Sequence, residues 1–443
     1  MKRIIWTVVG AGLLIALLWA GVFYWRHLRG AGPAFMGPPQ DIVQLMEKAG
    51  AAGEAGKSAS PAKNTTNFPL KLPPGFSISI FAKDLGGPRV LKLDTSGTLL
   101  ASLPSQGRIV ALPDADGDGR ADKIVTVASG LNRPHGFAFH PQNPRKLYIA
   151  EVEQLATYDY DPQKLKAANK RKIADLPSGG GRHWTRTLLF IGKDTRAGLK
   201  PAPTEERQMS PAAPVSASSP RLLISVGSSC DTCVEEDPRH GTIQVVDADG
   251  GNLQPFATGL RNAVFMTRHP VTGQVWVTEM GRDFLGDNLP PDEINIVEEG
   301  RDYGWPWCYG KQVHDDTFDP GGKKKDFCKE TVPSYINIPA HSSPLGLAFV
   351  PATPPWPREY QHNLLVAYHG SWNRTIPTGY KVVLLKLDAQ GNFLDKEDFI
   401  NGWLTQDGAL GRPVDILVRP DGVMFISDDK AGVVYRVNYD KGD

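Results

Sequence analysis

From about residue 68 to the C-terminus, short apolar segments alternate with corners rich in Gly, Pro, Asn and Asp. Apolar segments bounded by such turn residues are typical of β-strands. One pattern recurs: a corner that bears Pro or Asn, an apolar strand, a turn of Pro, Asp or Gly, a second apolar strand, and a third strand. The chain beyond residue 68 is therefore expected to be a repetitive β structure.

The recurring pattern occurs in six copies. Their first strands are expected at residues 88–94, 133–141, 183–191, 261–270, 344–349 and 412–418. The first three copies start about 45–50 residues apart, and insertions lengthen the later spacings. Repeats of this length with three or four short strands are typical of propeller blades. We therefore expect an all-β fold, a six-bladed β-propeller. The alternative is a pair of β-sandwiches, which do not repeat a Pro-bearing corner at a fixed spacing.

The N-terminus carries an uninterrupted apolar segment. No charged residue occurs between residues 4 and 25, and Lys2 and Arg3 precede them. A helix of that length spans roughly 33 Å, enough for the hydrocarbon core of a bilayer. A cleaved signal peptide is the alternative, but its apolar region is usually about 7–15 residues long and ends in small residues. Here the segment ends in three aromatic residues followed by Arg26 and Arg29, which favours an uncleaved transmembrane helix.

The chain is expected to have three parts. Residues 1–29 form the N-terminal transmembrane anchor. Residues 30–67, rich in Gly, Ala, Pro, Ser and Lys, form a flexible linker with one helix-forming piece near residues 41–49. Residues 68–443 form the propeller, and a segment rich in Pro, Ala and Ser over residues 193–220 is expected to be an exposed insert between two strands of the third blade.

Composition agrees with a turn-rich exported protein. The chain holds 46 Gly and 37 Pro in 443 residues, above the ordinary combined share of roughly 12%. Its 49 basic and 48 acidic residues nearly cancel, which excludes a broad nucleic-acid-binding surface, so no nucleic acid is expected as a partner.

The four cysteines suggest two disulfides, Cys230–Cys233 and Cys308–Cys328, because an even, sparse set is typical of exported domains. Val234 rather than His follows the Cys-x-x-Cys, which argues against covalent haem attachment. Four-cysteine zinc binding is the other alternative, and the 74-residue gap between the pairs disfavours it.

An acidic loop between two expected strands offers hard oxygen ligands. Asp114, Asp116, Asp118 and Asp122 alternate with Gly and Ala in the run 114–122. Ca²⁺ takes six to eight oxygens, and the loop supplies several at once, although it lacks the Glu of a complete EF-hand. We expect a structural Ca²⁺ here; a plain Asp-Gly turn is the alternative.

The stretch 259–306 concentrates polar residues between strand-like segments. It contains the pair Arg261-Asn262 and the corner Gly281-Arg282. A guanidinium binds carboxylates in a bidentate manner, and glycine lets backbone carbonyls approach a metal. His183 stands at the start of another strand after a run of glycines, and its near-neutral pKa would suit a general base; a capping or satisfied polar residue is the alternative, which the residues alone favour. Corners of successive blades meet at one mouth of a propeller, so we expect these residues to converge.

Several ordered motifs together resemble the pyrroloquinoline quinone (PQQ)-dependent sugar dehydrogenases, the soluble glucose dehydrogenase-like and L-sorbosone dehydrogenase-like group. The resemblance covers roughly residues 68–439. The stretches that carry it are Gly259-Leu260-Arg261-Asn262, Glu279-Met280-Gly281, Asp292-Glu293-Ile294-Asn295, Tyr303-Gly304-Trp305-Pro306, His369-Gly370-Ser371-Trp372-Asn373-Arg374, Gly411-Arg412-Pro413-Val414-Asp415 and Ser427-Asp428-Asp429-Lys430-Ala431-Gly432.

The resemblance implies a six-bladed propeller that holds PQQ and Ca²⁺ at its mouth and oxidises a sugar. It implies that His183 is the catalytic base. It further implies PQQ contacts from Arg261, Asn262 and Arg412, with Arg374 or Lys381 as the cofactor lysine's counterpart, and a catalytic Ca²⁺ bound by carbonyls of Gly281 and Arg282. An arginine ring suits a tricarboxylate quinone, and Ca²⁺ would polarise its carbonyl.

This chain departs from the pattern at three places. Arg282 stands where the glucose enzymes have Pro, and four extra residues precede Asp292. Val414 replaces a second arginine. Ser228 stands where an Asp would orient the catalytic His, and Asp231 lies nearby in the Cys-x-x-Cys turn as a possible substitute.

We therefore expect a PQQ- and Ca²⁺-dependent enzyme that oxidises a sugar or sugar-derived aldehyde and passes electrons to a respiratory acceptor, a quinone or a cytochrome. It would be a single-pass protein of the inner (cytoplasmic) membrane with its catalytic domain in the periplasm; this orientation follows from the function, since the flanking charges are nearly symmetric. The alternatives are a Ca²⁺-dependent sugar lactonase and a non-catalytic propeller that binds a glycan.

Overall fold

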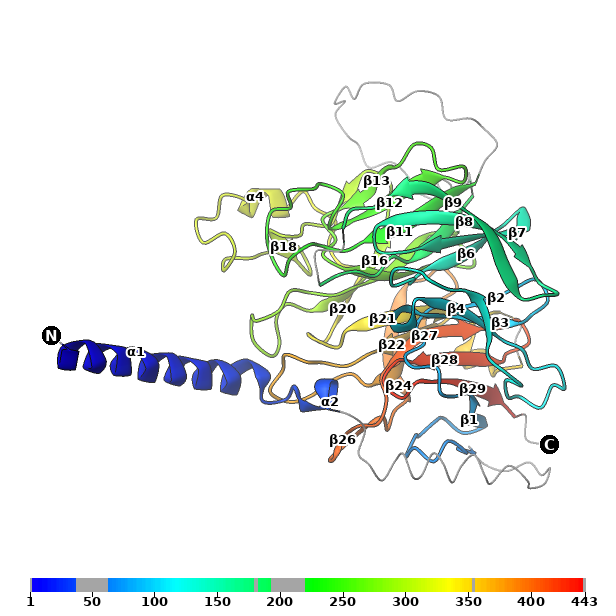
Figure 1. The fold of residues 1–443 in the computed structure, drawn as a ribbon, viewed down its shortest axis with the longest axis horizontal. Helices are drawn as coiled ribbons and strands as arrows, with labels where there is room; N and C mark the ends of the chain where they lie inside the picture. Colours follow the sequence, from blue (N-terminus) through cyan, green and yellow to red (C-terminus); the bar gives the residue numbers. More distant parts are fainter. Residues whose placement is uncertain (1, 37–62, 179–181, 193–219, 353–354, 441–443) are drawn as a thin grey trace.

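The computed structural model describes residues 2–36, 63–178, 182–192, 220–352 and 355–440. Six sheets of four or five strands make up the body of the molecule, and two short hairpins are added to them (Figure 1). The helices are short apart from the N-terminal one. The predicted six-bladed β-propeller is confirmed.

The first three blades follow the chain in order. Blade one contains β2 (Leu91–Leu93), β3 (Leu99–Leu103), β4 (Arg108–Leu112) and β5 (Val125–Ala128), with a 3₁₀ turn at Pro104–Gln106. Blade two contains β6 (Phe137–His140), β7 (Asn143–Ala150), β8 (Gln154–Asp161) and β9 (Lys166–Asp175). Blade three contains β10 (Leu188–Ile191), β11 (Arg221–Val226), β12 (Thr242–Asp247), β13 (Gln254–Thr258) and the short parallel strand β17 (Arg301–Asp302).

The other three blades complete the ring. Blade four contains β14 (Ala263–Arg268), β15 (Val275–Glu279), β16 (Asp292–Val297) and β20 (Ile336–Ile338). Blade five contains β21 (Pro344–Phe349), β22 (Leu364–Tyr368), β23 (Lys381–Leu387) and β24 (Phe393–Ile400), with a 3₁₀ turn at Arg358–Tyr360. Blade six contains β27 (Pro413–Val418), β28 (Met424–Asp428), β29 (Val433–Tyr439) and β1 (Phe76–Ala82). The two hairpins are β18 (Cys308–Tyr309) with β19 (Val313–His314), beside α4 (Lys325–Cys328), and β25 (Leu404–Thr405) with β26 (Gly408–Ala409).

Strand β1 closes the ring. It pairs antiparallel with β29, from Phe76 opposite Tyr439 to Ala82 opposite Val434, and the two lie side by side in Figure 1. The last blade therefore takes its outer strand from the start of the domain. The sequence pattern located three strands of this blade, but it did not assign β1 to blade six.

Hydroxyl side chains on second strands join neighbouring blades. Thr278 Oγ1 donates to Leu345 O at 2.8 Å, and Ser427 Oγ donates to Arg89 O at 2.5 Å. These groups are buried, so each bond satisfies a polar atom that would otherwise be costly to desolvate. They hold successive inner strands in a constant relation, which keeps the blade corners at one end of the channel.

Both predicted disulfides are present: Cys230 bonds Cys233 and Cys308 bonds Cys328. The first closes a turn after β11. The second ties the segment that carries β18 to the helix α4.

The N-terminal helix α1 (Lys2–Phe23) continues as one π-helical turn, Tyr24–Leu28, and projects away from the propeller (Figure 1). Its segment Val9–Leu28 is long and apolar enough to cross a membrane. A membrane anchor and a signal sequence both meet that criterion.

The ends of the predicted linker belong to the folded part. The helix α2 (Gly32–Phe35) lies against the propeller, where Gly30 N donates to Arg374 O at 3.0 Å. At the other end, Thr65 N donates to Ile78 O at 2.9 Å. The helix-forming piece near residues 41–49 and residues 193–219 of the expected insert lie outside the described residues. The strands on either side of that insert, β10 and β11, pair directly.

We expect Phe76→Ala to weaken the closure of the ring. The Phe76 side chain is fully buried and contacts the rings of Trp356, Tyr360, Phe399 and Tyr439 at centroid distances of 4.8–5.2 Å. Removing a buried Phe typically costs about 3–5 kcal/mol. The urea midpoint of unfolding should fall clearly in this variant and hardly in Leu394→Ala, since Leu394 is exposed on β24. Equal midpoints would contradict the closing role of β1.

Candidate functional site

One cavity of about 510 Å³ lies at the mouth of the channel. Most of its wall is built from residues that precede first strands of blades or follow second strands. Those that precede a first strand include Arg89, Thr185, Asn262, Ser343 and Arg412, and those that follow a second strand include Met280, Gly281 and His369. The expected convergence of blade corners is therefore observed, and the volume suits a cofactor-sized ligand.

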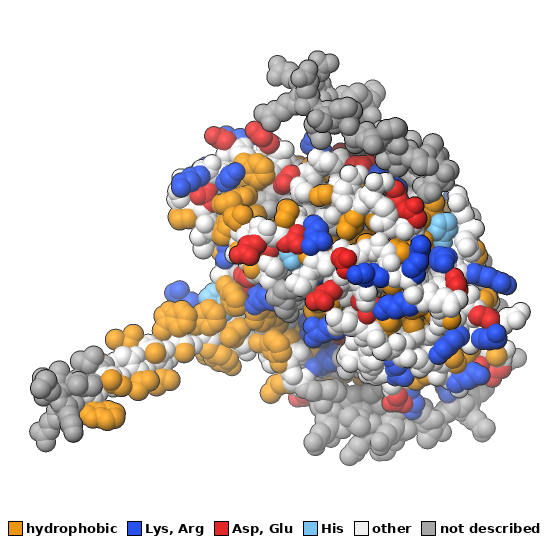
Figure 2. Space-filling model, turned by 45° about the horizontal axis from the view of Figure 1, so that its top comes forward, with side chains coloured by type: hydrophobic (Ala, Val, Ile, Leu, Met, Phe, Trp, Pro, Cys, Tyr) orange, Lys and Arg blue, Asp and Glu red, His pale blue; other side chains and the backbone are white. Residues whose placement is uncertain are grey.

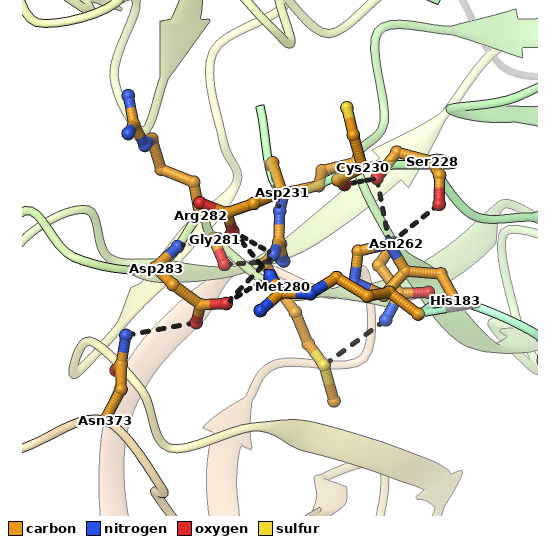
Figure 3. Close-up of polar contacts among 12 residues, drawn as sticks. His183, Ser228, Cys230, Asp231, Asn262, Met280, Gly281, Arg282, Asp283 and Asn373 are labelled. Atoms are coloured by element: carbon orange, nitrogen blue, oxygen red, sulfur yellow. Dashed lines mark hydrogen bonds and ion pairs between the residues drawn. The ribbon is translucent and has the colours of Figure 1, made fainter. Parts of the chain in front are cut away.

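His183 is held in one tautomer at the cavity wall. Its Nδ1 lies 3.0 Å from Ser228 O and 2.8 Å from Ser228 Oγ, and Ser228 Oγ donates its own hydrogen to Cys230 O at 2.7 Å (Figure 3). Both Ser228 oxygens are thus acceptors toward the ring, so Nδ1 carries the proton. Nε2 keeps a lone pair and has no hydrogen-bond partner among the described residues, and His183 lines the cavity.

A neutral His183 is also what its surroundings favour. Burial, together with the nearby Arg261 guanidinium, lowers the pKa of His183 to about 3. The imidazole is therefore uncharged over the whole neutral range, with the lone pair of Nε2 available as an acceptor. Gly227 permits this position: a Cβ there would lie 2.5 Å from His183 Cβ and 2.7 Å from Asn262 Oδ1.

The hydrogen-bond donors of Arg261 are all used by acceptors within the protein. Its Nε donates to Asp231 O at 2.8 Å, Nη2 contacts Asp231 Oδ1 at 2.7 Å, and Nη1 donates to Gly281 O at 2.8 Å. Two longer bonds reach Met280 O at 3.3 Å and Asp283 Oδ2 at 3.5 Å. All five N–H groups of the guanidinium are directed at these acceptors. Arg261 therefore contributes positive charge and holds the corner together, instead of offering hydrogens to a ligand.

Asp231 consequently does not replace the missing aspartate beside His183. It anchors Arg261 and accepts a 3.0 Å hydrogen bond from Asp283 N, while Ser228 orients the imidazole (Figure 3). Burial opposes ionisation of Asp231, but the Arg261 guanidinium lowers its pKa below the usual value. Burial raises the pKa of its neighbour Asp283.

The corner Gly281-Arg282 does not fit the Ca²⁺ expected there. The carbonyl of Gly281 accepts from Arg261, which places a guanidinium at that oxygen. The Arg282 side chain points to Asp315, with Nη1 and Oδ2 2.8 Å apart. Asp292, the nearest acidic side chain along β16, accepts backbone N–H groups of Gly281 and Ser343 at 2.9 and 2.8 Å. Two cations cannot share this site without strong repulsion.

The acidic loop 114–122 lies away from the cavity. Carboxylate oxygens of Asp114, Asp116 and Asp118 lie within 4.8 Å of one another. One oxygen of Asp114 is buried without a partner. Asp122 Oδ2 instead accepts from Ala115 N at 2.8 Å and closes the loop. The first three residues have the donor chemistry of a hard-cation site.

Four arginines surround the cavity: Arg89, Arg182, Arg261 and Arg412. Arg412 is held by His369 O and Gly370 O at 3.1 and 2.6 Å and lies 5.7 Å from the Tyr380 ring centroid. Its Nη1 has no protein acceptor within the described residues. This arrangement offers a buried guanidinium to an anionic ligand.

Two residues predicted for cofactor binding lie outside this ring. Arg374 donates to Ala340 O at 3.0 Å on the rim. Lys381 pairs with Asp398 at 2.6 Å and faces a separate surface pocket beside Tyr380. Neither residue borders the cavity. Lys381 begins β23, the third strand of its blade, so it lies apart from the first strand, which is the one next to the channel.

No site role was predicted for Arg89 or for the His369–Asp429 pair, although His369 and Asp429 lie in stretches that carry the family resemblance. His369 Nε2 lies 2.9 Å from Asp429 Oδ1, and Arg89 Nη1 lies 2.5 Å from Asp429 Oδ2. Burial, reinforced by Arg412, lowers the pKa of His369 to about 4. Arg89 precedes β2 as Arg412 precedes β27, and that equivalence between blades was the available signal.

The cavity fits a planar anionic quinone such as PQQ in charge and in unsatisfied polar atoms. On the residues that line it, buried atoms without partners include Asn262 Oδ1 and Arg89 Nε. Met280 Sδ and the Trp184 ring add soft apolar surface. Asn262 Nδ2 contacts Met280 Sδ at 3.4 Å, so its oxygen is the free end (Figure 3).

We expect Ser228→Asp to raise the pKa of His183. A carboxylate beside Nδ1–H stabilises the imidazolium, whereas Ser228→Ala keeps the carbonyl acceptor and the low pKa. NMR titration of the histidine rings, with His183→Gln for assignment, measures both variants. Identical titrations would contradict the Ser228 contact.

The low pKa of His183 also predicts how the folding stability changes with pH. The unfolded chain binds a proton on this His near pH 6.5, but the folded chain does so only near pH 3. Folding stability is therefore lost as the pH falls from about 6.5 to about 3, and Ser228→Asp should reduce that loss.

Comparison with known proteins agrees with this geometry. The family model described as TrAA12-like matches residues 70–199 and 216–440. An uncharacterized protein of Borreliella burgdorferi is 29% identical over 377 residues, which cover 84% of this chain and 91% of that protein.

A PQQ-dependent pyranose dehydrogenase of Coprinopsis cinerea is 26% identical over 368 residues, covering 73% of this chain and 46% of that enzyme. This chain thus spans about half the length of that relative. The holo form of the PQQ domain of the Coprinopsis cinerea pyranose dehydrogenase superposes with a TM-score of 0.66 at 22% identity, over 84% of this chain and 97% of that one, which shows the shared fold. The resemblance to PQQ-dependent sugar dehydrogenases is confirmed, and the chain belongs to the TrAA12-like family.

Proposed function

We propose that this protein is a PQQ-dependent dehydrogenase that oxidises a sugar or sugar-derived aldehyde in the cavity at the propeller mouth. One observation carries the proposal: a neutral histidine with a free Nε2 borders a cavity ringed by arginines. The Coprinopsis cinerea relative is a pyranose dehydrogenase that depends on the same quinone.

PQQ would be held by the cavity arginines. Arg412 and Arg89 would face its carboxylates, and Asn262 would offer its unpartnered oxygen or, rotated, its amide hydrogens. Arg261 would affect PQQ binding indirectly, through its positive charge and by holding the corner at Gly281 in place. When bound, the quinone supplies an acceptor for a hydride.

The protein's part in the reaction is proton transfer and positioning. His183 Nε2 would accept the proton of the sugar C1 hydroxyl, which is the proton that C1 must lose to become a carbonyl. The new positive charge on the imidazole would be shared through Nδ1–H with the Ser228 oxygens. An anionic cofactor would offset the Arg261 charge and so raise the basicity of His183.

Of the two calcium sites predicted from the sequence, only one is kept in the proposal. Because Arg261 occupies the carbonyl of Gly281, no step is assigned to a metal at Gly281 or Arg282. A structural Ca²⁺ is proposed only for the loop of Asp114, Asp116 and Asp118.

The proposed setting is a membrane. Segment Val9–Leu28 would anchor the protein, with the propeller on the periplasmic side and electrons leaving to a quinone or a cytochrome. The lactonase alternative is weaker, because no group of three His, Cys, Asp or Glu ligands in the described residues converges at the cavity. A purely glycan-binding propeller would have no need of the free His183 Nε2.

We expect His183→Gln to bind PQQ but to lose turnover. General-base catalysis typically contributes about 10²–10⁴-fold. The full chain in detergent, loaded with PQQ, is assayed by dye reduction over a panel of aldoses, and retained PQQ absorbance is measured after gel filtration. His140→Gln is the control, since His140 ends β6 at the other end of the channel. If the unaltered protein retains no PQQ after gel filtration, the proposal is wrong. If His183→Gln is fully active, His183 is not the general base.

We expect Arg412→Gln to weaken PQQ binding about 10- to 100-fold, because a hydrogen bond to a charged group is worth about 1.5–3 kcal/mol. Arg419→Gln is a matched control, because Arg419 follows the same strand at its far end and pairs with exposed Asp421. Equilibrium titration with PQQ gives both affinities. A thermal unfolding curve for each variant separates lost binding from lost structure, and equal affinities would contradict the assignment.

A further inference from the structure

Exposed apolar side chains gather where the N-terminal helix meets the propeller. Phe35 and Met36 are 73% and 70% exposed, and Leu289 and Ile376 are 47% and 70% exposed. Figure 2 shows hydrophobic side chains continuing from the helix onto the adjoining surface of the propeller. We call Phe35, Met36, Leu289 and Ile376 the mouth rim.

The mouth rim is tied to the N-terminal helix by an aromatic chain. Phe23 contacts Phe284 at a centroid distance of 5.4 Å, Phe284 contacts Trp372 at 5.6 Å, and Trp372 contacts Phe35 at 6.2 Å. The 3.0 Å bond from Gly30 N to Arg374 O lies two residues from Ile376. These contacts fix the propeller beside the end of the helix.

The contact at Phe23 sets the depth of the rim. Phe23 lies inside the apolar span Val9–Leu28, about five residues before its end. At 1.5 Å per residue, the loop that carries Phe284 reaches about 8 Å back along the span. Arg29 lies 4.6 Å from the Trp25 ring centroid, and such pairs are typical of the bilayer interface. The loop to Leu289 is thus level with the interfacial layer.

The rim borders the cavity itself. Phe35 and Trp372 are part of the cavity wall, so the N-terminal segment forms one side of the entrance. The two charged residues between the apolar rim positions are held by hydrogen bonds: Asp287 accepts from Thr375 N at 2.9 Å, and Arg374 Nη1 donates to Ala340 O at 3.0 Å. A partly apolar rim whose charged groups are hydrogen-bonded suits the headgroup layer.

We propose that the mouth rim inserts into the interfacial layer of the bilayer that holds α1, so that the cavity opens toward the lipid surface. This rests on the anchoring part of the proposed function and not on the cofactor. Ligands and electron acceptors would then reach the cavity along the membrane surface.

The test uses the full chain in phosphatidylcholine vesicles. All four cysteines form disulfides, so a new cysteine can be labelled selectively with the fluorophore NBD. Ile376→Cys and Leu289→Cys report on two loops of the rim. Val271→Cys is the control, because Val271 is 57% exposed in the turn between β14 and β15, at the opposite end of the channel.

Both rim probes should show blue-shifted emission and at least twofold stronger quenching by doxyl-labelled lipid than the control probe. Water-like emission from either rim probe, on a chain whose intact mass includes residues 1–28, overturns the proposal. So does shielding without lipid quenching, which would indicate a second copy on the rim. A chain that has lost those residues overturns the anchoring as well, whereas PQQ binding is measured separately and depends on neither outcome.

Discussion

The pairing of β1 with β29 holds the ring closed, and the cavity depends on that closure. Side chains from five of the six blades line the wall, so their separations are set by the angles between blades and not by any single loop. The Ser427 bond to Arg89 O crosses the junction between blade six and blade one, close to the cavity arginines. Loss of β1 would loosen the junction on which the His369–Asp429–Arg89 cluster lies.

At the mouth of the propeller, the buried Arg261 holds together the loops around His183. Arg261 joins the Cys230–Cys233 turn, through Asp231, to the corner at Gly281, and its charge helps keep His183 neutral. The disulfide turn also supplies the carbonyl that orients Ser228. The turn is therefore connected to both the base and the arginine. A metal at Gly281 would compete with this network for the same carbonyl.

The N-terminal segment is more than a tether. Its helix α2 and the residues before it contact blade-five loops, and Phe35 takes part in the cavity wall. The chain combines the propeller with a helix long enough to cross a membrane. The proposed membrane anchoring would link access to the cavity with the position of the bilayer.

Much of the fold and part of the candidate site could be predicted from the sequence. The six first strands, the disulfide pairs and the placement of His183, Asn262 and Arg412 at one mouth follow from local signals: turn residues, apolar segments, and a repeat that puts equivalent corners at one end. Three features needed the tertiary structure. The ring closure by β1 joins residues about 360 apart in sequence, and no local pattern encodes that pairing. Ser228 rather than Asp231 contacts His183, because the disulfide turn points Asp231 at Arg261. Lys381 faces away from the cavity and Arg89 lines it, since Arg89 precedes the first strand of its blade whereas Lys381 lies on the third strand, farther from the channel.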